Sequence, residues 1–219
     1  MRRLFIAIFG ILLSLFTSTP AFAHDDGDWQ LWNTESIEGK LNKGWKVKLE
    51  EEFRFGDSME ALYYHHTDLS LTYKLTDWFF LGIAFRQIYE KKNGEWREEN
   101  RPHINGTFKW TMHEFNLKNR SRLEYRIREG KEETMRYRNK LTVTPPFKWT
   151  KLSIQPFVAD EVFGDFDKGE LNRNRFYMGI KAKLSENLKL NIFYLWQTSK
   201  KQEEWLNCNV VGIKLGFVF

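Results

Sequence analysis

The chain has 219 residues, and its 34 Lys and Arg residues outnumber its 29 Asp and Glu residues, which gives a formal net charge of +5. This length fits one domain, and the single cysteine, Cys208, excludes an intramolecular disulfide and has no neighbouring His or Cys that would suggest a metal site. After residue 23 no apolar stretch is long enough for a transmembrane helix, so a membrane location requires a closed β-barrel.

The first 23 residues have the pattern of a secretory signal peptide. Arg2 and Arg3 form a positive start, residues 4–16 are an apolar run, and Ala21 and Ala23 form an A-x-A cleavage site. An uncleaved membrane anchor is the alternative, but the apolar run is short for a span and a cleavage site follows it. We therefore expect export with cleavage near Ala23, which lowers the formal charge from +5 to +3 because Arg2 and Arg3 are removed.

Residues 24–44 follow as an N-terminal segment whose alternation of apolar and polar residues is poor. It contains Trp29, Leu31 and Trp32 and then a polar run that leads into a turn at residues 40–44. We expect this segment in the lumen or at the rim of a barrel. Its alternative role is that of an extra strand.

Residues 45–219 alternate between apolar and polar side chains with the period of a β-strand. The clearest stretch is residues 115–128, where Leu117 and Leu123 share one face and Arg122 and Arg126 share the other. Breaks in the pattern divide these residues into about ten strands, and strands of about ten residues suit a tilted membrane crossing. An even number is usual for bacterial outer-membrane barrels, and twelve strands is the alternative if residues 24–44 also contribute.

The last strand predicts how such a barrel is assembled. Leu215, Phe217 and Phe219 lie on one apolar face, and the sequence stops on the aromatic Phe219. This ending resembles the closing strand of outer-membrane barrels, which carries the assembly signal. It implies the barrel-assembly machinery and periplasmic chaperones as partners.

Alternation alone does not separate a membrane barrel from a soluble one, so two further features decide. Longer charged loops alternate along the chain with shorter or proline-marked connections, as in outer-membrane barrels. The charged loops are residues 56–60, 91–99, 129–133, 164–169 and 199–204. Aromatic residues also gather near both ends of the strands, as in interfacial girdles. We predict an all-β, antiparallel transmembrane β-barrel of the bacterial outer membrane, with short periplasmic turns, longer charged extracellular loops, and lipid and lipopolysaccharide as its surroundings.

Several stretches of the chain are similar to one known family. They are Trp29–Trp32 (WQLW), Trp45–Phe55 with EEFRF at its end, Leu69–Leu75 with YKL, Asn119–Arg126 with RSRLEYR, and Leu171–Phe176 with NRNR. In these stretches the chain resembles the DUF2490 family of uncharacterised bacterial outer-membrane β-barrel proteins. The resemblance implies a membrane barrel and no established activity, and it supplies no catalytic residues.

The polar face of the strands predicts a basic lumen, because many of the acidic residues fall in the loops instead. Around residues 129–133 we expect Arg126 opposite Arg136, Glu124 opposite Arg138, and Arg122 opposite Lys140. Buried guanidinium groups need water, anions or carboxylates as partners. The predicted basic cluster is Arg122, Arg126, Arg128, Arg136, Arg138 and Lys140, and its predicted acidic partners are Glu50, Glu52, Glu90, Glu124 and Glu161.

Three functions fit this lumen. Its charges could fill a narrow barrel as a salt-bridged core, since a small barrel leaves little room between long side chains. They could instead line a narrow pore that favours anionic or phosphorylated solutes. Lipopolysaccharide phosphates are a further partner for Arg173 and Arg175 near the loops. Basic residues at strand spacing argue against a nucleic-acid groove.

The third function is an outer-membrane enzyme that acts on lipid or envelope substrates. His66 and Asp68 are expected to point into the lumen and His65 toward lipid, and no Ser nucleophile is paired with a base by spacing. His103 and His113 are isolated, so the sequence predicts no metal site and no cofactor.

Overall fold

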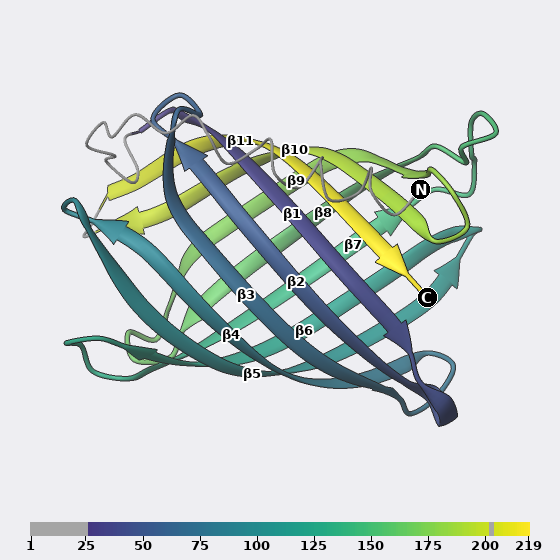
Figure 1. The fold of residues 1–219 in the computed structure, drawn as a ribbon, viewed down its shortest axis with the longest axis horizontal. Helices are drawn as coiled ribbons and strands as arrows, with labels where there is room; N and C mark the ends of the chain where they lie inside the picture. Colours follow the sequence, from purple (N-terminus) through teal and green to yellow (C-terminus); the bar gives the residue numbers. More distant parts are fainter. Residues whose placement is uncertain (1–25, 202–203) are drawn as a thin grey trace, which may run out of the picture.

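The structure, a computed structural model, describes residues 26–201 and 204–219 and forms a closed β-barrel (Figure 1). The predicted signal peptide, residues 1–23, lies outside the described residues. The predicted all-β closed barrel is confirmed, and no helix among the described residues is long and apolar enough to cross a membrane. The strands are β1 (Asp28–Lys40), β2 (Trp45–Gly56), β3 (Ala61–Lys74), β4 (Phe79–Lys92), β5 (Glu95–Met112), β6 (Phe115–Arg128), β7 (Thr134–Thr144), β8 (Gln155–Asp165), β9 (Glu170–Lys183), β10 (Leu188–Lys201) and β11 (Glu204–Val218).

The N-terminal segment is part of the barrel wall. Asp28–Lys40 forms β1, which pairs antiparallel with β2 and parallel with β11, so it lies neither inside the lumen nor at the rim. The described barrel therefore has eleven strands, between the predicted ten and the alternative twelve. In a meander with an odd number of strands, the first and the last strand run in the same direction. The parallel β1–β11 pair is the consequence.

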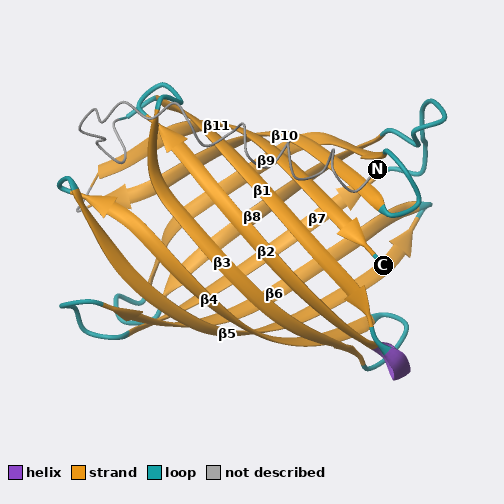
Figure 2. Ribbon diagram, viewed as in Figure 1, coloured by secondary structure: helices purple, strands orange, loops and turns teal. Residues whose placement is uncertain are grey.

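The connections gather at two ends of the barrel (Figure 2). We call the end with residues 57–60, 93–94, 129–133 and 166–169 the loop end, and the end with residues 41–44, 75–78, 113–114, 145–154 and 184–187 the turn end. Residues 42–44 form a short 3-10 helix, η2 (Asn42–Gly44).

The lengths of the connections differ from the prediction in three places. In the predicted loop at residues 199–204, the described residues belong to strands, because β10 and β11 pair as far as Lys201 and Glu204. The predicted loop at residues 91–99 is only a turn at residues 93–94, because β4 and β5 pair as far as Lys92 and Glu95. The connection at residues 145–154 is longer than expected, and within it Trp149 and Ile154 form an isolated bridge.

The two faces of the wall differ in polarity. Glu124 and Glu161 point inward and are at most 1% exposed, whereas Leu69 and Ile83 point outward and are 54% and 59% exposed. The alternation of the sequence thus places polar side chains in the lumen and most apolar ones outside. The outward apolar side chains include Leu49, Leu69, Leu81, Ile83, Phe85, Ile104, Val158, Met178, Ile192 and Ile213.

The strand predicted to carry the assembly signal presents its apolar face outward. Leu215, Phe217 and Phe219 are 36%, 44% and 66% exposed. The amide of Phe219 donates a hydrogen bond to the carbonyl of Glu38 in β1 at 3.0 Å, and the amide of Lys40 donates to the carbonyl of Phe219, also at 3.0 Å. These residues therefore combine an accessible apolar face with backbone pairing at the parallel seam.

One side of the lumen holds the larger of two buried apolar clusters. Side chains from β1, β8, β9, β10 and β11 pack together there, and the ring of Phe193 lies against this cluster. Two glycines make room for that ring, because a Cβ atom on Gly212 would lie 2.1 Å from Cζ of Phe193 and one on Gly179 would lie 2.6 Å from its Cβ. The buried members of the cluster are Trp32, Phe157, Ala159, Tyr177, Leu195, Cys208 and Val210.

We expect Gly212→Ala to lower the free energy of unfolding by about 1–3 kcal/mol, the range for an overpacked core. The reason is the contact of the new methyl group with Phe193. Denaturant unfolding of the refolded barrel measures the effect. Gly216→Ala on the same strand is the control, because its Cβ would lie 3.3 Å from Oγ of Ser36, which can rotate away. Equal stability of the two variants would contradict the prediction.

Candidate functional site

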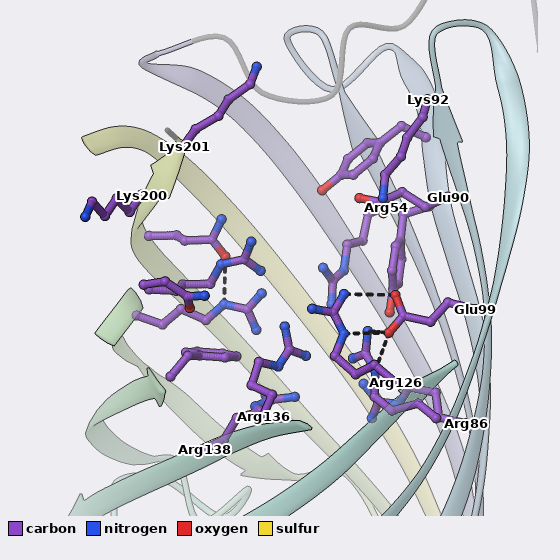
Figure 3. A pocket seen from close by; sticks show the side chains of 18 of the residues that line it. Arg54, Arg86, Glu90, Lys92, Glu99, Arg126, Arg136, Arg138, Lys200 and Lys201 are labelled. Atoms are coloured by element: carbon purple, nitrogen blue, oxygen red, sulfur yellow. Dashed lines mark hydrogen bonds and ion pairs between the residues drawn. The ribbon is translucent and has the colours of Figure 1, made fainter. Parts of the chain in front are cut away.

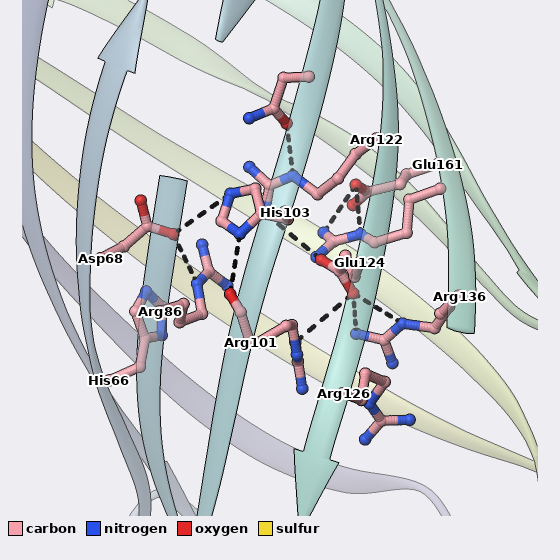
Figure 4. Close-up of polar contacts among 12 residues, drawn as sticks. His66, Asp68, Arg86, Arg101, His103, Arg122, Glu124, Arg126, Arg136 and Glu161 are labelled. Atoms are coloured by element: carbon pink, nitrogen blue, oxygen red, sulfur yellow. Dashed lines mark hydrogen bonds and ion pairs between the residues drawn. The ribbon is translucent and has the colours of Figure 1, made fainter. Parts of the chain in front are cut away.

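A network of buried ion pairs spans the middle of the lumen (Figure 4). Its acidic and basic members come from β3 to β8, and each of them is less than a tenth exposed. We call it the central network. Its carboxylates are Asp68, Glu124 and Glu161, its guanidiniums are Arg86, Arg101, Arg122, Arg136 and Arg138, and its imidazole is His103.

Glu124 is the centre of this network. Its Oε2 accepts hydrogen bonds from Nε and Nη2 of Arg136 at 2.9 and 2.5 Å, and its Oε1 accepts one from Nη1 of Arg138 at 2.8 Å. Nη1 of Arg122 lies 3.5 Å from Oε1, and Nη1 of Arg101 lies 3.7 Å from Oε2. Four guanidiniums from three strands thus surround one carboxylate that is 0% exposed.

Glu161 on β8 has a similar arrangement. Its Oε1 accepts from Nη2 of Arg138 and Nη2 of Arg120, each at 2.7 Å. Its Oε2 accepts from the hydroxyl of Tyr177 at 2.9 Å and lies 4.0 Å from Nη1 of Arg175. Arg138 therefore links the two buried glutamates across β6, β7 and β8.

Two buried imidazoles lie beside carboxylates on the β2–β5 side. His66 has its ring nitrogens 3.8 Å from Glu50 and 3.7 Å from Glu52, and Nε2 of His103 lies 3.7 Å from Asp68. In the part of the chain that the structure describes, neither ring hydrogen-bonds to a Ser, Thr or Cys side chain. Neither imidazole is thus paired with a side-chain nucleophile among the described residues.

A cavity of about 500 Å³ opens above the central network at the loop end (Figure 3). Eight arginines and four lysines line it, against two glutamates, so it is strongly basic. Aromatic side chains form part of its walls. The basic residues are Arg54, Arg86, Arg101, Arg126, Arg136, Arg138, Arg173, Arg175, Lys91, Lys92, Lys200 and Lys201, and the acidic ones are Glu90 and Glu99.

The cations on the β4–β6 side of this cavity have carboxylate partners. Arg126 donates from Nε and Nη2 to the two oxygens of Glu99 at 2.7 and 2.9 Å. Arg101 donates from Nε and Nη2 to Oε1 of the same glutamate at 3.0 and 2.6 Å. Lys92 lies 2.5 Å from Glu90. The charge of this wall is largely compensated.

The cations on β9 are compensated much less. Arg175 donates from Nε to the amide oxygen of Gln197 at 2.7 Å, and its closest carboxylate oxygen, on Glu161, is 4.0 Å away. The side chain of Arg173 forms no hydrogen bond or ion pair with any residue in the described ranges, 26–201 and 204–219, and its guanidinium lies at the ring of Phe163. The net positive charge of the cavity is therefore concentrated at Arg173 and Arg175.

The ring of Phe163, which is only 1% exposed, holds arginines around the cavity. Its centroid lies 4.5 Å from the guanidinium carbon of Arg138, 4.9 Å from that of Arg175, 5.3 Å from that of Arg136 and 5.6 Å from that of Arg173. Contact with an aromatic ring orients a guanidinium while its N–H groups remain free to donate in its plane.

Trp32 and Tyr64 hold a further arginine at the opposite wall. The guanidinium of Arg54 lies 3.7 Å from the ring of Trp32 and 4.0 Å from that of Tyr64. It also donates to Oε1 of Glu52 at 2.6 and 2.8 Å. Aromatic contacts thus fix arginines on both sides of the cavity.

The predicted basic residues lie at different levels of the barrel. Arg122, Arg136 and Arg138 belong to the central network, and Arg126 lines the loop-end cavity together with Arg136 and Arg138. Arg128 lies nearer the loops, where its Nη2 donates to the hydroxyl of Thr134 at 3.0 Å. The remaining residue, Lys140, lies toward the turn end with its Nζ 3.2 Å from the ring centre of Tyr177.

The predicted pairing between β6 and β7 is wrong by two residues. The structure places Glu124 opposite Arg136, Arg122 opposite Arg138, and Arg120 opposite Lys140. The connection at residues 129–133 sets this register, and the alternation pattern is unchanged when the strands slip by two. The true register lets Glu124 neutralise Arg136 directly.

The predicted acidic residues also lie at different levels. Glu50 contacts Lys48 and Lys214 at 2.6 and 2.5 Å toward the turn end, Glu52 pairs with Arg54, and Glu90 lines the cavity. Glu124 and Glu161 are in the central network. Glu99 falls within the predicted loop at residues 91–99, but the structure places it in β5 with its side chain inward. The alternation of Glu99, Arg101 and His103 is the sequence signal for this position.

Comparison with known proteins identifies a family. A family model described as a protein of unknown function (DUF2490) matches residues 29–207, which run from β1 into β11. None of the curated proteins matches the chain. In the described ranges, no group of three or more His, Cys, Asp or Glu residues is arranged to hold a metal ion.

Proposed function

The chain belongs to the DUF2490 family, whose function is unknown. We propose that it is an outer-membrane β-barrel protein that binds anionic solutes in the loop-end cavity of its lumen. One observation carries this proposal. The cavity has twelve basic side chains against two acidic ones, and its least compensated cations, Arg173 and Arg175, lie side by side on β9.

The outer face supports the membrane part of the proposal. Large apolar side chains such as Ile83 and Met178, which are 59% and 47% exposed, cover much of it. A closed barrel pairs its backbone groups between strands, and this is the only way in which strands can cross hydrocarbon. A bacterial outer membrane would hold this barrel with its loop end outside and Phe219 at the periplasmic end, after cleavage near Ala23.

Clustered arginines support anions as the ligand class. A guanidinium binds phosphate and carboxylate groups through two parallel N–H donors, and a cavity with one sign of charge concentrates the opposite ion. Phosphates of lipopolysaccharide and phosphorylated solutes share this chemistry. The outward apolar face of β11, with Leu215, Phe217 and Phe219, supports a second set of partners, the barrel-assembly machinery and periplasmic chaperones.

The central network favours binding over free passage. Its side chains are less than a tenth exposed and fill the lumen directly below the cavity. An open pore would need room for hydrated ions between Glu124 and Glu161, where Arg138 now bridges the two carboxylates. We therefore propose a bound anion at the loop end and little steady current.

Two measurements on the mature protein refolded in zwitterionic detergent test the proposal. After reconstitution, we expect the protein to float with liposomes in a density gradient. In calorimetric titration we expect inorganic phosphate and pyrophosphate to bind, pyrophosphate more tightly because of its larger charge, and sodium chloride to weaken both. A protein that stays in the aqueous fractions would disprove the membrane location. A folded barrel that gives no heat change of either sign with both anions, at two temperatures, would disprove anion binding.

A further inference from the structure

A patch of polar side chains interrupts the apolar outer face of the barrel at the middle of β6 to β9. It consists of outward polar side chains on neighbouring strands, of which Ser121 and Asn139 are directly opposite each other and Asn139 and Asn174 lie on either side of Val162. We call it the outer polar patch. Its members are Asn119, Ser121, Tyr137, Asn139, Asp160 and Asn174.

Most of the hydrogen bonds of this patch join its own members. Asn119 and Asn139 exchange amide hydrogen bonds at 2.9 and 3.0 Å, and Asn139 also donates to Oγ of Ser121 at 3.1 Å. The hydroxyls of Ser121 and Tyr137 are 2.9 Å apart. On the other side, Nδ2 of Asn174 donates to both oxygens of Asp160 at 3.1 Å. The patch therefore has a half rich in donors on β6 and β7 and a half with a carboxylate on β8.

The half on β6 and β7 has hydrogen-bond donors without an acceptor, and the half on β8 has acceptor sites without a donor. Asn119 has two amide hydrogens and uses one, and the Ser121–Tyr137 pair has two hydroxyl hydrogens and uses one between them. Asp160 accepts only from Asn174 among the described residues, although a carboxylate has sites for about four hydrogen bonds. Spare donors and a spare charged acceptor thus lie on neighbouring strands.

The surroundings of the patch offer nothing to satisfy these groups. Leu141, Val158 and Met178 lie around it, outward and 37%, 43% and 47% exposed. In the outer membrane this height of the wall faces lipid tails, which neither donate nor accept. Polar side chains that face hydrocarbon are costly, and in membrane proteins they commonly hydrogen-bond to a neighbouring protein surface.

We propose that a second copy of this chain covers the outer polar patch, as a twofold dimer within the membrane. The proposal rests on the membrane location proposed above. A twofold axis near Val162, which lies between Asn139 and Asn174 in the register, brings the Asp160 of each copy to the spare donors of Asn119 and Tyr137 of the other. A twofold contact requires this self-complementarity of one patch.

The polar interruption of the outer face on β1 and β2 lacks that property. Glu35 and Glu51 lie directly opposite each other there, and both offer only acceptors when ionised. Two copies joined there would bring together four carboxylates. The observations thus favour β6–β9 over β1 and β2 as the dimer face, and Leu69 on the neighbouring β3 serves as a control position.

Cysteine cross-linking in liposomes tests the dimer. In a Cys208→Ser background, we expect Val162→Cys to give a disulfide-linked dimer on oxidation at a low protein-to-lipid ratio. Leu69→Cys, outward on β3 and 54% exposed, is the control for random collisions and should give at least fivefold less dimer. Adding Asp160→Leu and Asn139→Leu to the Val162→Cys protein should lower its cross-linking to the level of the control.

Two outcomes would overturn the dimer. One is equal cross-linking of the Val162→Cys and Leu69→Cys proteins in liposomes, and the other is unchanged cross-linking when Asp160 and Asn139 are replaced. Flotation and phosphate titration of the same samples separate this failure from that of the proposed function. A protein that floats, binds phosphate and does not cross-link refutes only the dimer, whereas one that does not float refutes the membrane location as well.

Discussion

Replacing Glu124 by Gln is expected to lower the free energy of unfolding by about 3–5 kcal/mol, the range for the removal of one partner from a buried ion pair. Glu124 is fully buried and accepts from Arg136 and Arg138 at 2.5 to 2.9 Å, with Arg101 and Arg122 close by. A neutral amide leaves these guanidiniums without their shared counter-charge. The change keeps the shape of the side chain, so lost charge rather than lost volume causes the effect.

Denaturant unfolding of the refolded protein measures this loss, and Glu95→Gln is its control. Glu95 also pairs with an arginine, Arg97, at 2.5 Å, but the two side chains are 70% and 49% exposed. Exposed pairs of this kind contribute about 0–1 kcal/mol. Equal stability of the two variants would mean that the central network does not stabilise the barrel.

A second substitution distinguishes uncompensated charge from other causes. Combining Glu124→Gln with Arg136→Gln removes one of the guanidiniums that lost its partner, so the double variant should recover part of the stability lost by the single one. Coupling of this kind is expected for residues that are in contact or belong to one ion-pair network. Additive losses would instead indicate that each side chain matters through its packing.

The sequence predicts the barrel wall well because one physical rule governs it. Strands in a closed sheet turn alternate side chains to opposite faces, so Leu117 and Leu123 follow one face and Arg122 and Arg126 the other wherever the strand begins. The same rule predicted the Arg-rich lumen. It needs no knowledge of which strands are neighbours.

Strand number and register depend on pairing, which alternation does not report. The outward Asn33 and Glu35 break the apolar face of β1, so alternation does not identify it as a strand, yet backbone pairing with β2 and β11 places it in the wall. The predicted β6–β7 register differs from the observed one by two residues, and a shift of two keeps every side chain on the same face of the sheet. Only the geometry of the connections decides such cases.

The candidate site was predicted only in part, because it joins residues that are far apart in the chain. Arg54 on β2 and Arg173 on β9 line one cavity, and Phe163 on β8 holds Arg136 and Arg138 of β7 beside Arg173. Local patterns place each residue inside the barrel. Which cations share a carboxylate, and which do not, follows from register and tilt around the whole barrel.

The second large effect is expected from Arg173→Gln combined with Arg175→Gln, which should weaken phosphate binding by tenfold or more. A hydrogen bond to a charged group contributes about 1.5–3 kcal/mol, and one such bond lost corresponds to at least tenfold in affinity. These two arginines are the least compensated cations of the cavity, so they are the ones most available to an anion. Calorimetric titration with inorganic phosphate and pyrophosphate measures the change.

The double variant should bind phosphate more weakly without becoming less stable to denaturant. Arg173 pairs with no described carboxylate and lies beside Arg175 around the ring of Phe163, so removing both charges relieves repulsion. The cost is the contacts with that ring and the hydrogen bond from Arg175 to Gln197. Unfolding in the absence of anions should then require no less denaturant than the wild type. Lys168→Gln, at the loop end but outside the cavity lining, should leave phosphate affinity unchanged. If the double variant binds phosphate as tightly as the wild type, the anion does not bind at Arg173 and Arg175. A loss of binding with preserved stability would instead show that these arginines serve a ligand and not the fold.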